Sequence, residues 1–480
     1  MSTNNLPKPD NHVIVLFGAT GDLAKRKLLP GWFHLYAAGL LPKEFRLIGS
    51  APPNTAMTDE QFREHAEQSC EDFCITKPED GPWSEFAANL SFAAAEPGNA
   101  GDLVAAVRRA EKEIGGTPRR LYHLAIPPVA FTSMVGMLGA SGLATDRTRV
   151  IIEKPFGTDL ASARKLDQAV HAVFDESQVF RIDHFLGKES VDNILAFRFA
   201  NGLYEPIWNR FHLRYVEIDV PETLSIAGRA EFYDATGAYK DMVVTHLFQV
   251  LAFVAMESPV SLSAKHLRDE KEKVFEAIRP IDVRHVVRGQ YEGYRSEPGV
   301  AADSQTETMV AVRAEVDNWR WHGVPFFLRS GKAMGVSRQI IVLGFQPPPM
   351  RMFPAHRKDT PYGRQNEIVI DFADPGAIKV YFLTKVPGAQ LTLGNAEMAF
   401  YYKDSFAASH MLEGYEHLTL MAMIGDPSLF TRSDGIERVW EISEPLLENP
   451  PPVEPYPVGS YGPESMKRLI APYHWHLPHV

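Results

Sequence analysis

The chain has 480 residues, of which 45% are hydrophobic and 23% are charged, proportions typical of a globular protein with one to three domains. Its formal net charge of -11 argues against nucleic acid as the main partner, although a local basic pocket for a small anion is compatible with it. Residues 1–12 lack an apolar signal core and no apolar run reaches membrane-spanning length, so we expect a cytoplasmic protein without a membrane partner. Cys70 and Cys74 are spaced neither as CxxC nor within a ligand cluster, so we interpret them as reduced structural thiols and expect no metal site.

A buried strand followed by a glycine turn opens the chain. His12–Phe17 is a short apolar run, Gly18-Ala19-Thr20-Gly21-Asp22-Leu23-Ala24 follows it, and a helical pattern comes next. In this context Gly18 permits a sharp turn, Gly21 lets a pyrophosphate approach the backbone, and the helix N-terminus presents free N–H groups to the anion. The spacing is GxxG rather than the full GxGxxG. The basic run Lys25–Lys27 is either a solvated helix face or a further phosphate contact.

Strands and helices alternate through the first 180 residues. Apolar runs at 46–50, 121–126 and 149–152 predict further buried strands, and helical patterns separate them. The last of these strands leads into Glu153-Lys154-Pro155-Phe156-Gly157, which puts a charged pair at its carboxyl end, where open α/β sheets bind ligands. Residues 1–180 therefore predict a doubly wound, Rossmann-type dinucleotide-binding domain in an α/β protein.

Beyond about residue 200 the pattern changes. Alternating polar and apolar residues predict strands at 211–220, 308–317, 339–345, 367–372 and 377–384. A long helical segment over Asp234–Met256 interrupts them. Alternation of this kind is typical of an antiparallel sheet with one face on a core. We therefore expect residues 181–480 to form a larger α+β domain with a mainly antiparallel sheet.

A charged stretch, Arg181-Ile182-Asp183-His184-Phe185-Leu186-Gly187-Lys188-Glu189, is a candidate for the chemistry. Asp183 and His184 could orient a base or act as acid and base themselves. If a helix covers the stretch, His184 and Lys188 lie one turn apart on one face, an arrangement that suits a phosphate better than a metal because Lys is a poor metal ligand. The alternative is a charged loop that leads into the amphipathic helix Ser190–Phe199.

Four stretches of the chain together resemble the signature sequences of the glucose-6-phosphate dehydrogenase family. They occur in that family's order at similar spacings, and they are GATGDLA at 18–24, EKPFG at 153–157, RIDHFLGKE at 181–189 and DMVVTH at 241–246. The resemblance extends over nearly the whole chain and includes Leu328–Ala333. It implies oxidation of D-glucose 6-phosphate at C1 to 6-phospho-D-glucono-1,5-lactone, the first oxidative step of the pentose phosphate pathway, with hydride transfer to NADP.

The resemblance also implies a role for individual residues. His246 matches the general base and Asp183 the acid that orients it. The substrate ligands match Lys154, His184, Lys188, Glu222, Asp241 and Lys332. The cofactor ligands match Gly18, Thr20, Gly21, Asp22, Leu23, Ser50, His123 and Lys154. Spacing alone would not select His246 among 17 histidines, and it lies about 140° from Asp241 around an ideal α-helix.

The chain departs from the family pattern at three places. Phe185 and His123 stand where the family usually has Tyr, and Ser50-Ala51-Pro52 lacks the usual Arg after the second strand. An Arg at that place accommodates the 2′-phosphate of NADP and an acid accepts from the NAD ribose. The stretch offers neither, so we expect NADP as the cofactor, with NAD also possible. The family usually assembles through its sheet domain, so we expect a homodimer or homotetramer.

Two other functions remain open at this point. One is a Glu-Lys-Pro-type dehydrogenase acting on an unphosphorylated sugar, although such a substrate has no use for two cations at His184 and Lys188. The other is a non-catalytic dinucleotide-sensing protein, because GATG loops also occur in regulators. That function leaves Asp183 and His246 unexplained.

Overall fold

The computed structural model describes residues 8–74, 80–226, 228–350, 352–353, 366–406 and 412–477. These residues form two compact units, which we describe one at a time. The first unit comprises Met1–Lys188, Ser261–Arg268 and His410–Glu437, and the second comprises Glu189–Val260, Asp269–Ser409 and Arg438–Val480. Among the described helices none is both long enough and apolar enough to cross a membrane.

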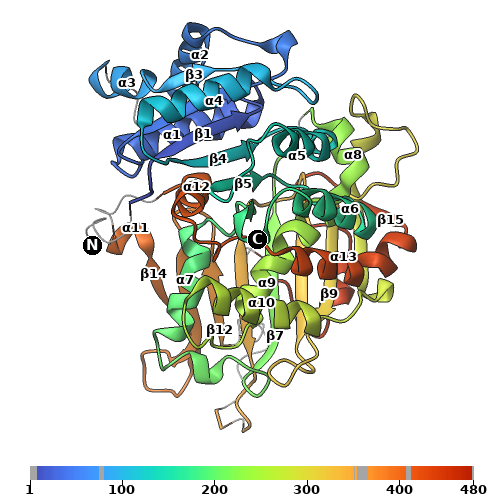
Figure 1. Cartoon of the computed structure of the whole chain (residues 1–480). Helices are drawn as coiled ribbons and strands as arrows, with labels where there is room; N and C mark the ends of the chain where they lie inside the picture. The colour runs from blue at the N-terminus through green and yellow to red at the C-terminus, as the bar shows by residue number, and fades with distance from the viewer. Residues whose placement is uncertain are drawn as a thin grey trace. The chain divides into compact units, whose positions relative to one another are not determined.

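A six-stranded sheet in the order β3-β2-β1-β4-β5-β6 forms the centre of the first unit (Figure 1). Its strands are β1 (His12–Phe17), β2 (Phe45–Ser50), β3 (Leu90–Phe92), β4 (Arg119–Leu124), β5 (Thr148–Ile152) and β6 (Val179–Arg181). All of its pairings are parallel. This strand order is the doubly wound one, and the predicted Rossmann-type fold is confirmed.

Helices cover both faces of this sheet. They are η1 (Ala24–Leu28), α1 (Leu29–Ala37), α2 (Asp59–Phe73), α3 (Asp80–Ala87), α4 (Gly101–Ile114), α5 (Phe131–Ala140), α6 (Leu160–His171) and α12 (Gly414–Ile424). Ile48 of β2 joins the core formed with α4, α5 and α6. Gly49, its neighbour in β2, faces the other way and leaves room for the Phe62 ring of α2. β1 is therefore buried on both sides, which explains its unbroken apolar sequence.

The second unit is built on a nine-stranded sheet in the order β14-β13-β12-β11-β7-β10-β9-β8-β15. The strands are β7 (Leu213–Pro221), β8 (Val286–Tyr291), β9 (Met309–Glu315), β10 (Pro325–Gly331), β11 (Ile340–Phe345), β12 (Glu367–Asp371), β13 (Ala377–Lys385), β14 (Leu393–Tyr401) and β15 (Val453–Tyr456). Only β7 with β10 and β8 with β15 pair in parallel. The predicted antiparallel sheet is confirmed, but the predicted strands omit β8, β10, β14 and β15.

The helices of the second unit include the predicted segment 234–256, which is divided into three parts. The helices are α7 (Glu189–Phe199), α8 (Ala230–Ala238), η6 (Tyr239–Leu247), α9 (Phe248–Ala255), α11 (Tyr402–Ser405) and α14 (Ser465–Ile470). Helices α10 (Ala264–Ala277) and α13 (Ser433–Glu448) each contain residues of both units. A kink lies inside α8 at Gly237, one residue before its end, where φ is 70°, and η6 is a π-helix.

A fully buried arginine ends α9. The Arg198 guanidinium donates to the carbonyls of Phe253 and Val254 at 3.1 Å and to that of Met256 at 2.9 Å. These are carbonyls that a helix end leaves without intrahelical partners. Glu205 pairs with the same guanidinium at 3.0 Å, so the buried charge is balanced. α9, and with it the adjoining η6, is therefore held at its C-terminal end.

Two buried carboxylates of β7 meet a buried guanidinium of β10 and a half-buried one from the segment before β11. Asp219 accepts from Arg329 at 2.7 Å and from Arg338 at 2.5 Å, whereas Glu217 lies 3.8 Å from Arg338. Burial acts to raise the pKa of Asp219, but the two guanidiniums outweigh it and hold that pKa below its usual range. Burial, reinforced by the neighbouring Asp219 charge, raises the pKa of Glu217 well above its usual range.

The raised pKa of Glu217 predicts a pH-dependent stability. The folded state keeps a proton on Glu217 that the unfolded chain releases above about pH 4.5, so the native state loses stability as the pH rises from there through the raised pKa. Glu217→Gln mimics the protonated form and removes this loss. In urea unfolding, the variant should gain at least about 1 kcal/mol over the wild type between about pH 5 and about pH 8. Parallel stability curves for the two proteins would contradict this, and Glu231→Gln, at an exposed position, is the control.

Candidate functional site

The glycine turn follows β1 and packs against the ends of the two neighbouring strands. The N–H groups of Gly18 and Ala19 donate to the Ser50 carbonyl at 2.9 and 3.2 Å, and the Gly21 N–H donates to the Gly18 carbonyl at 2.9 Å. Gly18 has φ of +76°, and a Cβ there would lie 2.1 Å from the Ala125 carbonyl oxygen. A Cβ at Gly21 would meet only the Gly18 carbonyl oxygen, at 3.1 Å. The backbone therefore requires glycine at the first position, whereas a methyl group at the second needs a shift of only a few tenths of an ångström.

The surroundings of the turn suit the phosphates and ribose of a dinucleotide. The chain enters η1 at Ala24, directly after the turn, so the N–H groups of a helix start there. Thr20 lies in the turn, Asp22 and Leu23 are the first helical residues after it, and all three are at least partly exposed. At the end of β2, the Ser50 hydroxyl is buried and has no hydrogen-bond partner among the described residues. A buried hydroxyl of this kind fits a site that a ribose hydroxyl completes.

The basic residues near the turn are engaged by other groups. Three exposed or half-exposed ion pairs account for the basic run: Lys25 with Asp72 at 3.1 Å, Arg26 with Asp22 at 2.6 Å and Lys27 with Glu413 at 2.8 Å. This favours the solvated helix face over a phosphate contact. The Arg63 Nε donates to the carbonyls of Ala87 and Leu90 at 3.1 and 3.2 Å. Arg63 is thus held by the end of α3 and the start of β3, so it does not supply the charge that Ser50 lacks.

Three side chains connect the carboxyl ends of β4 and β5 to α12. His123, at the end of β4, shares a hydrogen bond of 2.8 Å with Glu153, which follows β5. The Tyr415 hydroxyl of α12 donates to the other Glu153 oxygen at 3.2 Å. Burial and the Glu153 charge raise the pKa of Tyr415, so its hydroxyl stays protonated as a donor. Lys154 follows Glu153 at this edge and is partly exposed.

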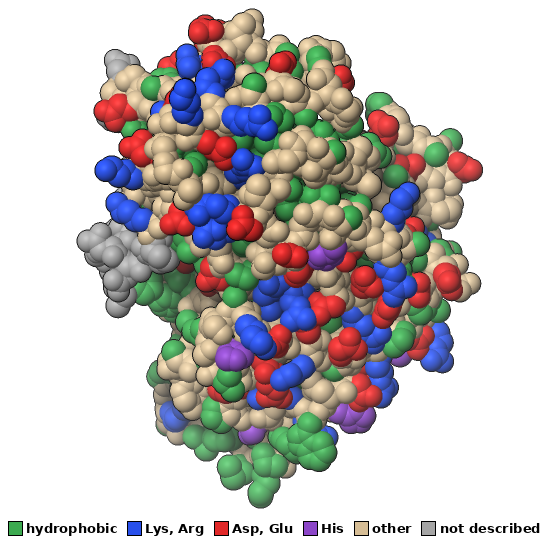
Figure 2. Space-filling view, in the orientation of Figure 1, with side chains coloured by type: hydrophobic (Ala, Val, Ile, Leu, Met, Phe, Trp, Pro, Cys, Tyr) green, Lys and Arg blue, Asp and Glu red, His purple; other side chains and the backbone are tan. Residues whose placement is uncertain are grey.

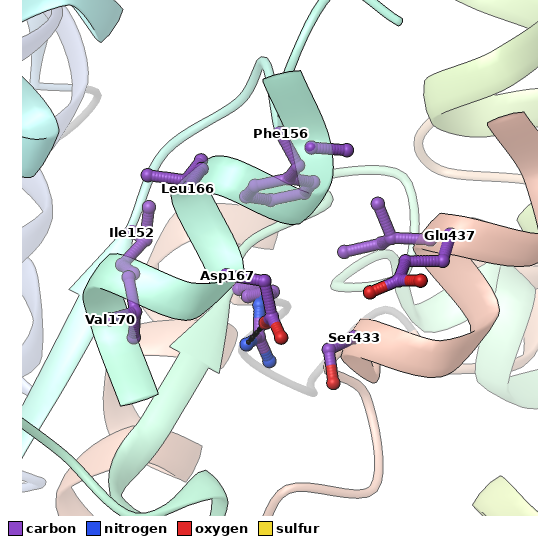
Figure 3. Close-up of a pocket in the computed structure, with 10 residues that line it drawn as sticks. Ile152, Phe156, Leu166, Asp167, Val170, Ser433 and Glu437 are labelled. Carbon is purple, nitrogen blue, oxygen red and sulfur yellow. Dashed lines mark hydrogen bonds and ion pairs between the residues drawn. The ribbon is translucent and has the colours of Figure 1, made fainter. Parts of the chain in front are cut away.

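The strand before the charged stretch is anchored at its last residue. Arg181 pairs with Asp167 of α6 and with Glu176, both at 2.7 Å, and its backbone bridges to Thr431. Figure 3 shows Asp167 and Glu437 facing a hollow of about 20 Å³ between α6 and the first turns of α13. A space of this size holds about one water molecule, so this region is packed and supports the strand rather than binding a ligand.

The charged stretch forms turns, and the condition that a helix covers it is not met. The Leu186 N–H donates to the Asp183 carbonyl at 3.0 Å and the Phe185 N–H donates to the Asp183 carboxylate at 2.9 Å. α7 begins only at Glu189. His184 and Lys188 are therefore not related by an α-helical turn, because the Asp183 side chain draws the backbone into a turn in place of a helix.

Phe185 is the platform on which the two cationic side chains lie. The His184 and Phe185 ring centroids are 5.0 Å apart, and the Lys188 ammonium lies 5.2 Å from the Phe185 ring centroid. Phe185 thus joins His184 and Lys188 through ring packing and a cation–π contact, although it has no hydroxyl. The Tyr415 ring stacks on His184 at 6.0 Å with an interplanar angle of 5°. Tyr415 was missed in the sequence, because a single Tyr more than 200 residues away gives no signal.

In α12, a close backbone approach brings Tyr415 to this turn. A Cβ at Gly187 would lie 2.4 Å from the Gly414 carbonyl oxygen, and a Cβ at Gly414 would lie 2.8 Å from the His184 carbonyl oxygen. His417 shares a hydrogen bond of 3.2 Å with the Gly187 carbonyl. The two glycines therefore allow the start of α12 to pack directly on the turn.

Two of the predicted substrate ligands meet in the second unit. β7 and β10 are parallel neighbours, so Glu222 and Lys332 both follow the carboxyl ends of their strands. The Lys332 ammonium donates to the Glu222 carboxylate at 2.5 Å, and the Glu222 N–H donates to the Gly331 carbonyl at 2.8 Å. Burial, with Asp241 as the largest contributing charge, raises the pKa of Tyr233 well above its usual range. Tyr233 was also missed in the sequence.

Asp241 and His246 lie on η6, and its geometry corrects the expected angle between them. The Phe248 N–H donates to the Val243 carbonyl five residues earlier, the hydrogen-bond pattern of a π-helix. Because that helix has a longer repeat than an α-helix, residues five apart lie close to one face rather than about 140° apart. Both side chains are buried.

The sequence and the structure both match known proteins over nearly their whole length. Residues 15–193 match the family model described as glucose-6-phosphate dehydrogenase, NAD binding domain, and residues 195–476 match that of its C-terminal domain. Glucose-6-phosphate 1-dehydrogenase 2 of Mycobacterium tuberculosis is 40% identical over 95% of this chain and 92% of its own. Glucose-6-phosphate 1-dehydrogenase 5, cytoplasmic, of Arabidopsis thaliana is 36% identical over 95% and 90%.

Two solved structures superpose on the whole chain. The glucose-6-phosphate 1-dehydrogenase of Mycobacterium avium has a TM-score of 0.87 at 36% identity and covers 99% of this chain and 100% of its own. A glucose-6-phosphate dehydrogenase in complex with its substrate glucose-6-phosphate has a TM-score of 0.90 at 32% identity, with the same coverage.

Alanine at each of the two glycines of the turn should affect a different property of the protein, thermal stability at Gly18 and NADP binding at Gly21. Gly18→Ala forces a Cβ onto the Ala125 carbonyl, so it should lower the melting temperature by several degrees. Gly21→Ala should melt like the wild type but weaken NADP binding, because its methyl group occupies the space needed for the pyrophosphate. Differential scanning fluorimetry and NADP titration separate the two effects. Equal melting temperatures for wild type and Gly18→Ala, or unchanged NADP affinity in Gly21→Ala, would contradict this account.

Proposed function

This chain belongs to the glucose-6-phosphate dehydrogenase family, and on that premise we propose which residues carry each step of its reaction. The chain is an NADP-dependent oxidoreductase that converts D-glucose 6-phosphate to 6-phospho-D-glucono-1,5-lactone, the first oxidative step of the pentose phosphate pathway. The match of both halves to this one family carries the conclusion. It favours this activity over an unphosphorylated-sugar dehydrogenase and over a non-catalytic dinucleotide sensor.

The proton of the substrate C1 hydroxyl passes to a histidine in this proposal. His246 is the general base, since an imidazole with an ordinary pKa near ~6.5 can accept a proton at neutral pH. Asp183 fixes the imidazole tautomer and stabilises the imidazolium that forms. NADP, when bound, supplies the nicotinamide carbon that accepts the hydride leaving C1. Support for His246 comes from its burial on η6, which continues directly into α9, the helix whose C-terminal end Arg198 holds.

The substrate phosphate is bound by His184 and Lys188. Both lie on the Phe185 platform, and the stacked Tyr415 ring holds His184 in place. Charge-assisted contacts to a phosphate are the strong class of hydrogen bond. Phe185 adds no hydrogen bond to the phosphate, so His184 and Lys188 are its two ligands from this turn.

The sugar is oriented by carboxylates and lysines in this proposal. Glu222 and Asp241 accept from its hydroxyl groups, and Lys332, which Glu222 holds at 2.5 Å, donates to the substrate. Lys154 contacts both the substrate and the nicotinamide. We assign no metal to this chemistry, because the family reaction needs only a base and a hydride acceptor.

The dinucleotide is held by the glycine turn. Gly18, Thr20, Gly21, Asp22 and Leu23 receive its pyrophosphate, Ser50 its ribose, and His123 is a further cofactor ligand. Ser50 offers a hydroxyl without charge, and Arg63 is engaged by backbone carbonyls. NADP is therefore used with weak discrimination against NAD.

The assembly and location also belong to this proposal. Residues 1–180 bind the dinucleotide, and residues 181–480 bind the substrate and form a homodimer or homotetramer. Exposed apolar side chains on the β13–β14 end of the sheet support that interface, namely Leu383, Val386, Leu391 and Met398. The composition and the cytoplasmic plant relative support a cytoplasmic location.

Removal of the base should lower turnover much more than binding. Loss of a general base costs a factor of ~10²–10⁴, so His246→Asn should lower kcat by at least that lower bound while Kd for glucose 6-phosphate changes little. Asp183→Asn should also lower kcat, because the amide leaves the wrong tautomer in place. Steady-state kinetics with equilibrium binding measure both. If His246→Asn turns over within a few-fold of the wild type, another residue is the base.

Loss of the phosphate ligands should act selectively on phosphorylated sugar. Lys188→Ala and His184→Asn should each raise KM for glucose 6-phosphate by about 10-fold or more, because each contact is worth roughly 1.5–3 kcal/mol. Their effect on the slow oxidation of unphosphorylated glucose should be small. Equal losses for the two sugars would mean that these residues support the fold or the sugar ring. Lys467→Ala, an exposed change in the second unit, is the control.

The cofactor preference should be weak. With a single charged contact missing, worth a few kcal/mol at most, the ratio of kcat/KM for NADP over NAD should fall well below a thousand. The measurement is initial rates with both cofactors at saturating glucose 6-phosphate. A preference of a thousand-fold or more would show that another cation contacts the 2′-phosphate.

A further inference from the structure

A hollow of about 430 Å³ lies in the second unit at the start of β7, and no residue with a role in the reaction lines it. Its volume is that of a site for a small organic ligand. The side chains that give it chemical character are Arg210, Arg214, His322, Phe211 and Tyr473. None of the described residues that line it is acidic. By contrast, Asp and Glu are interspersed with Lys and Arg over the face drawn in Figure 2.

Two guanidiniums in this hollow form no ion pair with any acid among the described residues. The Nε atoms of Arg210 and Arg214 are buried and have no hydrogen-bond partner in the part of the chain that the structure describes. Neither arginine forms an ion pair with a described acid, whereas Arg320 nearby pairs with Glu205 at 2.9 Å and with Glu257. Two like charges on one hollow repel each other, and an anion that engages both would remove that repulsion.

Both guanidiniums lie against aromatic rings. Arg210 lies 4.8 Å from the Phe211 ring centroid and 5.6 Å from that of Trp319, a ring that is 85% exposed. Arg214 lies 5.2 Å from the Tyr473 ring centroid. A cation–π contact uses none of the guanidinium N–H groups, and the terminal N–H groups of an arginine have the fork geometry that suits phosphate oxygens. The rings therefore pre-organise two phosphate-type donors.

We propose that this hollow binds a polyphosphate anion, either inorganic or the phosphate chain of a nucleotide. A polyphosphate carries several charged groups along one chain, so a single molecule can engage Arg210 and Arg214 together, which a monocarboxylate cannot do. His322 lines the same hollow, but Asp317 lies 2.6 Å from its Nδ1 and offsets its charge. The site therefore depends on the two arginines.

The test is isothermal titration of the full-length protein with sodium tripolyphosphate. The wild type should bind, and Arg210→Ala and Arg214→Ala should each weaken binding by about tenfold or more. The affinity should also fall as the salt concentration rises. Arg284→Ala, in the same unit and 83% exposed, is the matched control and should bind within about twofold of the wild type. Circular dichroism checks folding, and Arg210→Ala carries the test alone if Arg214→Ala does not fold.

Two further titrations identify the source of the phosphates. If ATP binds more tightly than tripolyphosphate and Trp319→Ala removes that gain in affinity, the site is assigned to a nucleotide. If ATP and tripolyphosphate bind with equal affinity, the site accepts any polyphosphate. Because ATP can also enter the dinucleotide site, only the part of its binding that Arg210→Ala removes is counted. The proposal is overturned if tripolyphosphate does not bind at millimolar concentration, if both arginine variants bind it like the wild type, or if adenosine binds as tightly as ATP. None of these readouts uses dehydrogenase activity, so they are independent of the proposed function.

Discussion

Parallel strand pairing is the constraint on which the reactive side chains of both units depend. Parallel neighbours end at the same edge of a sheet, so the residues that follow them are close in space however far apart they are in sequence. In the first unit this brings His123, at the end of β4, to Glu153 after β5. In the second, one parallel pair in a mainly antiparallel sheet brings Lys332 to Glu222. An antiparallel β10 would leave Lys332 at the far end of β7.

Buried ion pairs keep these strand ends in place. Arg181 anchors the strand that leads into the charged turn, and Arg329 ties β10 to Asp219 of β7. Arg329 and Asp219 are both fully buried, and removal of one partner from such a pair typically costs about 3–5 kcal/mol, because the other charge is left uncompensated. Each pair thus penalises a shift of its strand. Asp183 and Lys332, which have proposed roles in the chemistry, lie within two residues of the anchored ends of β6 and β10.

Much of the fold could be predicted because the pattern of hydrophobic residues along the chain indicates which segments form strands and how they are buried. Unbroken apolar runs identified the parallel strands β1, β4 and β5, and alternation identified most of the antiparallel sheet. β10 was missed because Phe326–Gly331 is buried on both faces and does not alternate. The glycine turn was recognisable because Gly18 meets a steric requirement that no other residue satisfies.

The site was less predictable, because its geometry departs from regular helices. At residues 183–188 the Asp183 carboxylate accepts a hydrogen bond from the Phe185 N–H, which favours a turn. The prediction of a helix over this stretch did not include that hydrogen bond. The π-helical repeat of η6 depends on tertiary packing, and its sequence is compatible with an α-helix. Tyr415 reaches His184 only because Gly187 and Gly414 let two segments touch. Contacts of this kind leave no periodic signal in the sequence.

The central claim is that this chain oxidises a phosphorylated sugar at C1. The most direct measurement is the absorbance of reduced nicotinamide when the purified protein and NADP are given glucose 6-phosphate, glucose or no sugar. The account predicts rapid formation of reduced cofactor with glucose 6-phosphate, a rate with glucose lower by at least about a hundredfold, and none without sugar. Equal rates with the two sugars, or no reduction with either, would contradict it.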